Sequence, residues 1–167
     1  MDVQLRNVPE QLVIAEQRMV DQAALESWLP GAMTRVHKAA GDAGAKTLDQ
    51  PHLQRDHAPE EPVFIVLYDG NPNEGETAVE CCTPLRAGSS APADAASRSI
   101  PAHREAYIRV RKNTVQSGQI GDVYMAIEKW VGENGLEVAA APRESYWTDF
   151  YAADENDEVL DVAYPVR

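Results

Sequence analysis

Residues 37–44 read His-Lys-Ala-Ala-Gly-Asp-Ala-Gly, and residues 128–135 read Glu-Lys-Trp-Val-Gly-Glu-Asn-Gly. The lysine and both glycines hold the same positions in the two stretches, 91 residues apart. Further stretches correspond in the same order along the chain: 8–9 with 100–101, and 79–85 with 160–166. This internal repeat predicts two similar modules that face each other, and the seam between them is a natural cleft for a ligand.

The size and composition are those of one soluble globular domain. The chain has 167 residues, of which 44% are hydrophobic and 25% are charged. We expect a single domain over 1–167, with a first module at about 1–86, a linker at about 87–98 and a second module at about 99–167. The net charge of −12 opposes direct binding to nucleic acid or to an anionic membrane, because such binding requires basic patches.

The chain carries no recognisable targeting or metal-binding pattern. Its N-terminus has no basic stretch followed by an apolar run, and no apolar run reaches the roughly 18–20 residues of a membrane span. Cys81 and Cys82 are adjacent on a predicted strand, so their side chains should point to opposite faces. The four histidines have no metal-ligand spacing. We therefore expect a reduced, cytoplasmic protein without a metal or cofactor.

The first half predicts strand, helix, strand, strand. Apolar residues at helical spacing follow Asp21, and Pro30 within them should split or kink the helix. Residues 45–62 are rich in proline and lack periodicity, which predicts a loop. Residues 3–8 form an apolar-rich stretch that Pro9 ends, and the predicted elements are a strand at 11–19, a helix from 21 to about 40, strands at 62–69 and 76–85, and a linker at 86–98.

The second half predicts the same order. Its predicted elements are a strand at 102–112, a polar loop at 113–119, a helix at 120–134, a strand at 143–152, a turn at 154–157 and a strand at 158–166. Each half is thus a β-α-β-β unit. Two such units predict an α+β fold with a largely antiparallel sheet, helices on one face and a central cleft.

The chain resembles the GyrI-like family, the small-molecule-binding domain of AraC- and MerR-type multidrug activators such as BmrR. The resemblance rests on the duplicated order of the motifs, loosely in the first half and closely in the second. The second-half stretches are Ile100-Pro-Ala-His-Arg-Glu-Ala-Tyr, Ala126-Ile-Glu-Lys-Trp-Val-Gly-Glu-Asn-Gly-Leu, Pro142-Arg-Glu-Ser-Tyr and Leu160-Asp-Val-Ala-Tyr-Pro-Val. The resemblance implies two pseudo-symmetric modules with a ligand pocket between them.

The chain departs from the family pattern in two places. Residues 113–121 read Asn-Thr-Val-Gln-Ser-Gly-Gln-Ile-Gly where many relatives have a Gly-Pro-Tyr signature. No helix-turn-helix precedes the domain in this sequence. We therefore expect a stand-alone member of the family.

Glu144 is the strongest candidate for a site residue. Period 2 along its predicted strand puts Glu144, Tyr146 and Thr148 on one face. The resemblance implies that the matching Glu and Tyr project into the pocket. A carboxylate in a partly apolar site is a strong countercharge for a cation, because little water screens it. The alternative is that Glu144 pairs with Arg143 or Lys129 on a solvated face of the sheet.

Five further aromatic residues are candidate ligand-binding walls. Tyr68 occupies the corresponding region of the first module, and packing in the core or at an edge is its alternative. Trp147 alternates in face with Tyr146, so only one of the two can share the surface of Glu144, and we expect that one to be Tyr146. We expect Trp147 to pack under the helices, as core aromatic residues usually do. Trp28 lies on a helical apolar stripe, which favours a core position. The complete set of candidates beside Glu144 and Tyr146 is Tyr68, Trp147, Tyr107, Tyr124 and Trp28.

Three functions fit these residues. The first is a stand-alone protein that senses or sequesters small aromatic or cationic lipophilic molecules. The second, implied by the resemblance, is a hydrolase of cyclopropane-bearing compounds, with Glu144 as general base and Tyr146 as hydrogen-bond partner or acid. The third is a gyrase-inhibitor-like interaction module, whose acidic surface would contact a basic protein. A monomer or weak homodimer is expected in each case.

Overall fold

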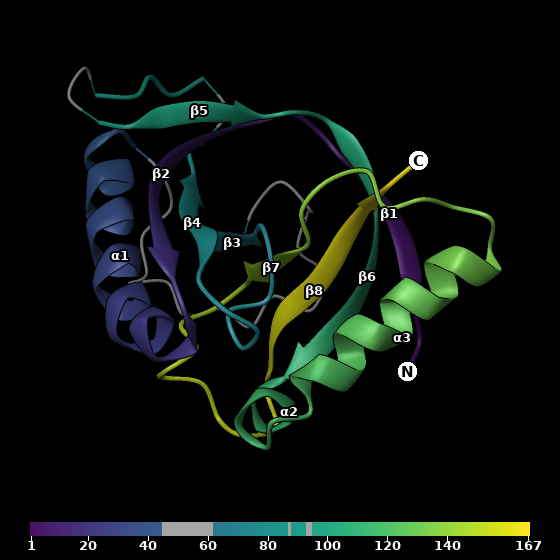
Figure 1. The fold of residues 1–167 in the computed structure, drawn as a ribbon. Helices are drawn as coiled ribbons and strands as arrows, with labels where there is room; N and C mark the ends of the chain where they lie inside the picture. The colour runs from purple at the N-terminus through teal and green to yellow at the C-terminus, as the bar shows by residue number, and fades with distance from the viewer. Residues whose placement is uncertain (45–61, 87, 93–94) are drawn as a thin grey trace.

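The computed structural model describes residues 1–44, 62–86, 88–92 and 95–167 (Figure 1). The predicted loop at 45–62 lies, apart from Pro62, outside these residues. In chain order the elements are β1 (Gln4–Val8), β2 (Gln11–Val20), α1 (Gln22–Asp42), β3 (Phe64–Tyr68), β4 (Thr77–Pro84), β5 (Ser97–Ile100), β6 (His103–Arg111), α2 (Lys112–Gln116), α3 (Ile120–Glu133), β7 (Arg143–Tyr146) and β8 (Glu158–Val166).

The strands form one sheet in the order β1-β6-β8-β7-β3-β4-β2-β5, with every neighbouring pair antiparallel. The α+β fold with a largely antiparallel sheet is thereby confirmed. The two halves of the sequence meet at the centre, where β7 pairs with β3. In this register Val66 lies opposite Glu144, and Phe64 lies opposite Tyr146.

The two long helices cover the same face of the sheet. Helix α1 contacts β2 and β4, whereas α3 contacts β6 and β8, as Figure 1 shows. One apolar core holds the inner sides of both helices and the strand residues that face them. Cys81 belongs to that core, while Cys82 lies in a smaller cluster on the opposite face, which confirms the predicted alternation.

The repeated glycines end both helices. Gly44 follows α1 with a φ of 89°, and Gly135 follows α3 with a φ of 66°. Both values lie in the left-handed region, which a residue with a Cβ atom rarely adopts. The repeat in the sequence therefore marks the same local structure twice, at the point where each long helix stops.

Pro30 does not split helix α1, which continues through it as one element, because burial of its apolar stripe offsets the hydrogen bond that proline cannot make. Three other predicted boundaries were wrong. The loop at 113–119 contains the short helix α2, whose polar residues gave no periodic signal. Strand β5 lies partly in the expected linker, and β7 ends at Tyr146 rather than at residue 152.

The face of the sheet opposite the helices carries buried ion pairs. The Asp161 side chain, fully buried, accepts hydrogen bonds from Arg6 Nη1 at 2.6 Å and Arg109 Nε at 2.9 Å. Arg6 Nη2 also lies 2.7 Å from Glu105 Oε1. Burial acts to raise the pKa of Glu105, but the hydrogen bond from His103 and the charge of Arg6 outweigh it and lower that pKa. These contacts tie β1, β6 and β8 together.

No helix in the described part of the chain is both long and apolar enough to span a membrane.

The buried ion pairs predict a large loss of stability when Asp161 is replaced. Asp161→Asn removes the charge that faces Arg6 and Arg109, so we expect the free energy of unfolding to fall by about 3 kcal/mol. Urea denaturation measures this change. Glu133→Gln is the control, because Glu133 pairs with Lys129 at 3.8 Å on an exposed helix face and should contribute less than about 0.5 kcal/mol. Equal stability of the two variants would contradict this account.

Candidate functional site

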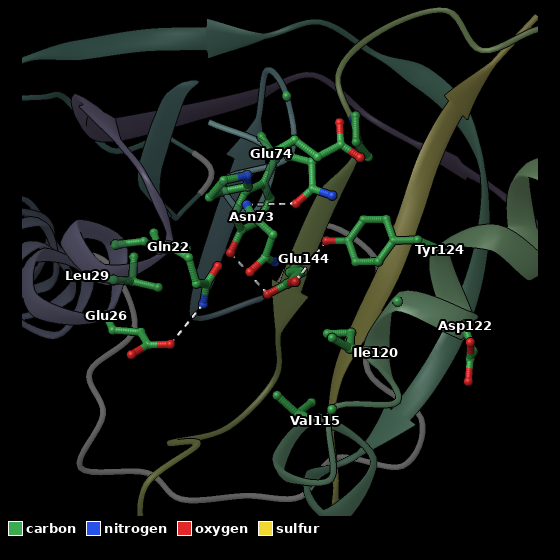
Figure 2. A pocket seen from close by; sticks show the side chains of 18 of the residues that line it. Gln22, Glu26, Leu29, Asn73, Glu74, Val115, Ile120, Asp122, Tyr124 and Glu144 are labelled. Carbon is green, nitrogen blue, oxygen red and sulfur yellow. Dashed lines mark hydrogen bonds between the residues drawn. The ribbon is translucent and has the colours of Figure 1, made fainter. Parts of the chain in front are cut away.

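A large open cavity lies between the two long helices on their side of the sheet. Its volume is about 1310 Å³, above the usual range of small-molecule pockets. The first half of the chain contributes the N-terminal part of α1 and the turn after β3, and the second half contributes residues 115–122, α3 and β7. In Figure 2, Leu29 of α1 and Tyr124 of α3 lie on opposite sides, with Glu144 between them. The cavity is thus built from both halves of the sequence.

Glu144 lies on the sheet at the inner wall of this cavity and is only 7% exposed. Three tyrosine hydroxyls donate to its carboxylate. The Tyr124 hydroxyl lies 2.8 Å from Oε1, and the Tyr146 hydroxyl lies 2.7 Å from Oε2. The Tyr68 hydroxyl makes a longer contact of 3.4 Å with Oε2. The carboxylate is therefore held from three elements, β3, α3 and β7.

Strand register explains why these groups converge. On β7, Glu144 and Tyr146 are two residues apart and share the face that the helices cover. The cross-strand neighbours of Glu144 are Val66 on β3 and Val162 on β8, both fully buried. Apolar side chains on both sides leave the carboxylate little access to water except through the cavity.

This environment sets the protonation of the site. Burial raises the pKa of Glu144, and hydrogen bonds from Tyr146, Tyr124 and Tyr68 oppose that rise by stabilising the ionised form. Burial and the charge of Glu144 raise the pKa of all three tyrosines well above their ordinary value, so their hydroxyls stay protonated as donors. Such a carboxylate can act as a countercharge for a cation or take a proton from a bound water molecule.

The lining of the cavity is acidic and aromatic. Among the lining residues that the structure describes, none is a lysine, an arginine or a histidine. The acidic ones are Glu26, Asp69, Glu74, Asp122, Glu128 and Glu144. On one wall, the Tyr124 and Tyr164 rings meet edge to face with centroids 6.0 Å apart. The electrostatic character of the cavity therefore favours positive charge.

The structure brings four of the predicted residues together. Glu144, Tyr146, Tyr68 and Tyr124 all line the cavity. The alternative for Glu144, an ion pair on a solvated face, is wrong. Lys129 pairs with Glu133 instead, and the neighbouring Arg143 alternates to the other face of the sheet.

Three of the predicted site residues do not line this cavity: Trp28, Tyr107 and Trp147. Trp28 is buried on α1, and its Nε1 donates to Glu16 Oε2 at 2.7 Å. Tyr107 lies on the opposite face of the sheet, with the Arg6 guanidinium 4.0 Å from its ring centroid.

The expectation that Trp147 packs under the helices was wrong. Its ring lies 5.5 Å from the Arg6 guanidinium and 6.0 Å from that of Arg109, on the face away from the helices. The period-2 alternation that places Tyr146 on the helix side places Trp147 on the other side.

Two residues of the site were missed by sequence reasoning. Tyr164 is buried on β8 and donates a hydrogen bond to Glu128 on α3, and both residues line the cavity. The sequence did contain a signal for the position of each residue. Glu128 follows Tyr124 by four residues, which places both on one face of the helix. Tyr164 follows Leu160 and Val162 at period 2, so it continues the strand face that the helices cover.

The hydrogen bonds from Tyr124 and Tyr146 should hold down the pKa of Glu144. Tyr146→Phe and Tyr124→Phe each remove one donor to the ionised form while keeping the ring, so we expect each change to raise that pKa further. Infrared titration of the carboxyl band, assigned with Glu144→Gln, measures the shift. Tyr107→Phe, on the other face, is the matched control and should leave the titration unchanged. A pKa that falls in either cavity variant would refute the assigned donor roles.

Comparison with known proteins identifies relatives of this fold. A sequence model of the GyrI-like small molecule binding domain matches residues 1–167. No curated protein matches the chain in a sequence search. The crystal structure of the EcmrR C-terminal domain is 20% identical, with a TM-score of 0.70 over 99% of this chain and 97% of that chain. In the EcmrR–DNA complex (19% identity, TM-score 0.67), the match covers 99% of this chain and 57% of the EcmrR chain.

Two further solved structures share the fold at lower identity. SAV2435 bound to tetraphenylphosphonium is 12% identical, with a TM-score of 0.57 over 100% of this chain and 94% of that chain. A hydrolase from Listeria innocua is 10% identical, with a TM-score of 0.53 over 99% of this chain and 91% of that chain. At these identities the structures establish a shared fold alone. With the family match over its whole length, this chain belongs to the GyrI-like small-molecule-binding domain family.

Proposed function

We propose that this protein binds bulky, aromatic or lipophilic cations in the cavity between its two modules, either to sense or to sequester them. One observation carries the proposal: a buried carboxylate, that of Glu144, lies at the cavity wall with tyrosine hydroxyls as its hydrogen-bond donors and no cation within reach among the described lining residues.

The energetics favour a cationic ligand. Burial of an ionised carboxylate costs several kcal/mol, and hydrogen bonds from neutral hydroxyls offset only part of that cost. A cation that enters the cavity supplies the missing countercharge where little water screens it. The faces of the lining tyrosines add cation–π attraction of about 0.5–2 kcal/mol each.

The size of the cavity and one structural neighbour agree with this ligand class. A volume of about 1310 Å³ leaves room for a ligand with several aromatic rings. SAV2435, which shares the fold, was solved bound to tetraphenylphosphonium, a bulky aromatic cation. That compound is therefore the probe of choice for this chain.

Glu144→Gln should weaken tetraphenylphosphonium binding by at least about tenfold, because it removes the buried countercharge while keeping the size of the side chain. Isothermal titration calorimetry at neutral pH measures the affinity. Glu133→Gln removes the same charge from the exposed side of α3 and should change the affinity by less than about twofold.

Lowering the pH should weaken tetraphenylphosphonium binding. Glu144 must be ionised to attract a permanent cation, and its pKa lies above its ordinary value of 4.5. The affinity should therefore begin to fall at a higher pH than protonation of an ordinary glutamate would produce, and Glu144→Gln should remove this component. Binding that is unaffected by both Glu144→Gln and acid would rule out the proposed role.

A second candidate function is hydrolysis at the same carboxylate. Its raised pKa makes Glu144 a stronger base than an ordinary glutamate when ionised. Tyr146, 2.7 Å from Oε2, is placed to exchange a proton with it. One structural neighbour is named as a hydrolase. In this reaction Glu144 would take a proton from water as the water oxygen attacks an electrophilic ring carbon of a cyclopropane-bearing substrate. The ring C–C bond would break, the carbon that leaves with the electron pair would take a proton from Tyr146, and Glu144 would return its proton to Tyr146.

Turnover distinguishes the two candidates. Incubation with a cyclopropane-bearing substrate, followed by mass spectrometry, should reveal a product with one added water molecule if the protein is a hydrolase. Glu144→Gln should then lower kcat by about a hundredfold or more, the usual contribution of a general base. If the compound binds and no hydrated product forms, the protein is a binder and the hydrolase candidate is excluded.

A further inference from the structure

A second carboxylate lies in the same cavity, one helical turn from the first site. Glu128 follows Tyr124 by four residues on α3 and lines the cavity. The hydroxyl of Tyr164, which is only 5% exposed, donates a hydrogen bond to Glu128 Oε1. Burial and this hydrogen bond raise the pKa of Tyr164, so the hydroxyl remains a donor. Glu128 itself is exposed to solvent and also lines the cavity.

The two carboxylates are joined through a pair of aromatic rings. Tyr124 donates to Glu144, Tyr164 donates to Glu128, and the two rings meet edge to face at 6.0 Å between centroids. The arrangement therefore presents an anionic group at each end of an aromatic wall. One anion is buried beside the sheet and the other is partly hydrated at the opening.

Other lining carboxylates are held differently. Glu26 is exposed and accepts a hydrogen bond at 3.0 Å from the half-buried Gln22 on its own helix. Asp122 points away from Glu144 in Figure 2. Among the acidic lining residues that the structure describes, Glu144 and Glu128 are the two that accept a hydrogen bond from a tyrosine hydroxyl. Since a defined position makes a carboxylate a better partner for a ligand, Glu128 is the best second contact.

We propose that the cavity prefers ligands with two positive charges joined by an aromatic or apolar spacer, with one cation at Glu144 and the other at Glu128. The inference rests on the proposed function, because it assumes that Glu144 receives the first cation. Once that cation is bound, the second group is held near Glu128 at high effective concentration. None of the described lining residues offers a basic side chain that would compete for either position.

Ethidium and propidium test this preference. The two dyes share one aromatic cation, and propidium carries a second quaternary ammonium on a short tether. We expect the wild-type protein to bind propidium more tightly than ethidium, by about tenfold at low salt. Glu128→Gln should lower the ratio of propidium affinity to ethidium affinity by at least about fivefold, because it removes the charge that faces the second cation. Tyr164→Phe removes the hydrogen bond that holds Glu128 in place but keeps the charge of Glu128. This variant should therefore lower the preference for propidium by a smaller factor.

Control variants separate a local contact from loss of net charge. Glu133→Gln removes a charge from the outer side of the same helix and should leave the propidium preference within about twofold of wild type. A preference that persists in Glu128→Gln, or falls equally in Glu133→Gln, overturns the second site. If ethidium binds through Glu144 and propidium binds no better, this inference alone fails. If neither dye binds, the proposed function fails with it.

Discussion

The site depends on one costly arrangement, an ionisable carboxylate buried where the two halves of the sheet join. Val66 and Val162 flank Glu144 on the neighbouring strands, so the sheet itself provides no countercharge. Tyrosine hydroxyls from three elements replace part of the lost hydration. A structure that keeps such a group on its inner surface forgoes stability that a hydrophobic residue would give. The cost is understandable if a cationic ligand relieves it.

The join between β3 and β7 is what makes this arrangement possible. It places Tyr68 from the first half within reach of Glu144 from the second half. The same join leaves α1 and α3 on one face (Figure 1). The cavity is lined by residues of both helices. The buried ion pairs around Asp161 lie on the other face, where they hold β1, β6 and β8 together. The sheet thus separates the buried ion pairs around Asp161 from the Glu144 carboxylate of the candidate site.

The repeat predicted most of the fold, because hydrophobic periodicity and helix-ending glycines are local signals. Strand β8 and helix α3 were predicted within one residue of their observed ends. Helix α2 was missed because it is short and polar, and because its start is anchored by distant backbone contacts, such as Lys112 N–H to the carbonyl of Asp157. The continuity of α1 through Pro30 likewise depends on tertiary packing that a sequence pattern does not contain.

The candidate site was predictable where it followed alternation along one strand, as for Glu144 and Tyr146. The grouping with Tyr68 and Tyr124 required the sheet order and the helix packing, which no spacing in the sequence encodes. The pair of Tyr164 and Glu128 was missed for the same reason, since it joins β8 to α3. Trp147 was placed on the wrong side because an aromatic residue was assigned to the core by type, while its alternation with Tyr146 pointed to the other face.

The most direct measurement is a crystal structure after soaking with tetraphenylarsonium, whose arsenic atom is located by anomalous scattering. The account predicts one strong arsenic peak inside the cavity, beside the Glu144 carboxylate and against the lining tyrosine rings. A peak that lies only on the outer surface of the molecule, or on the face that holds Asp161, would contradict it.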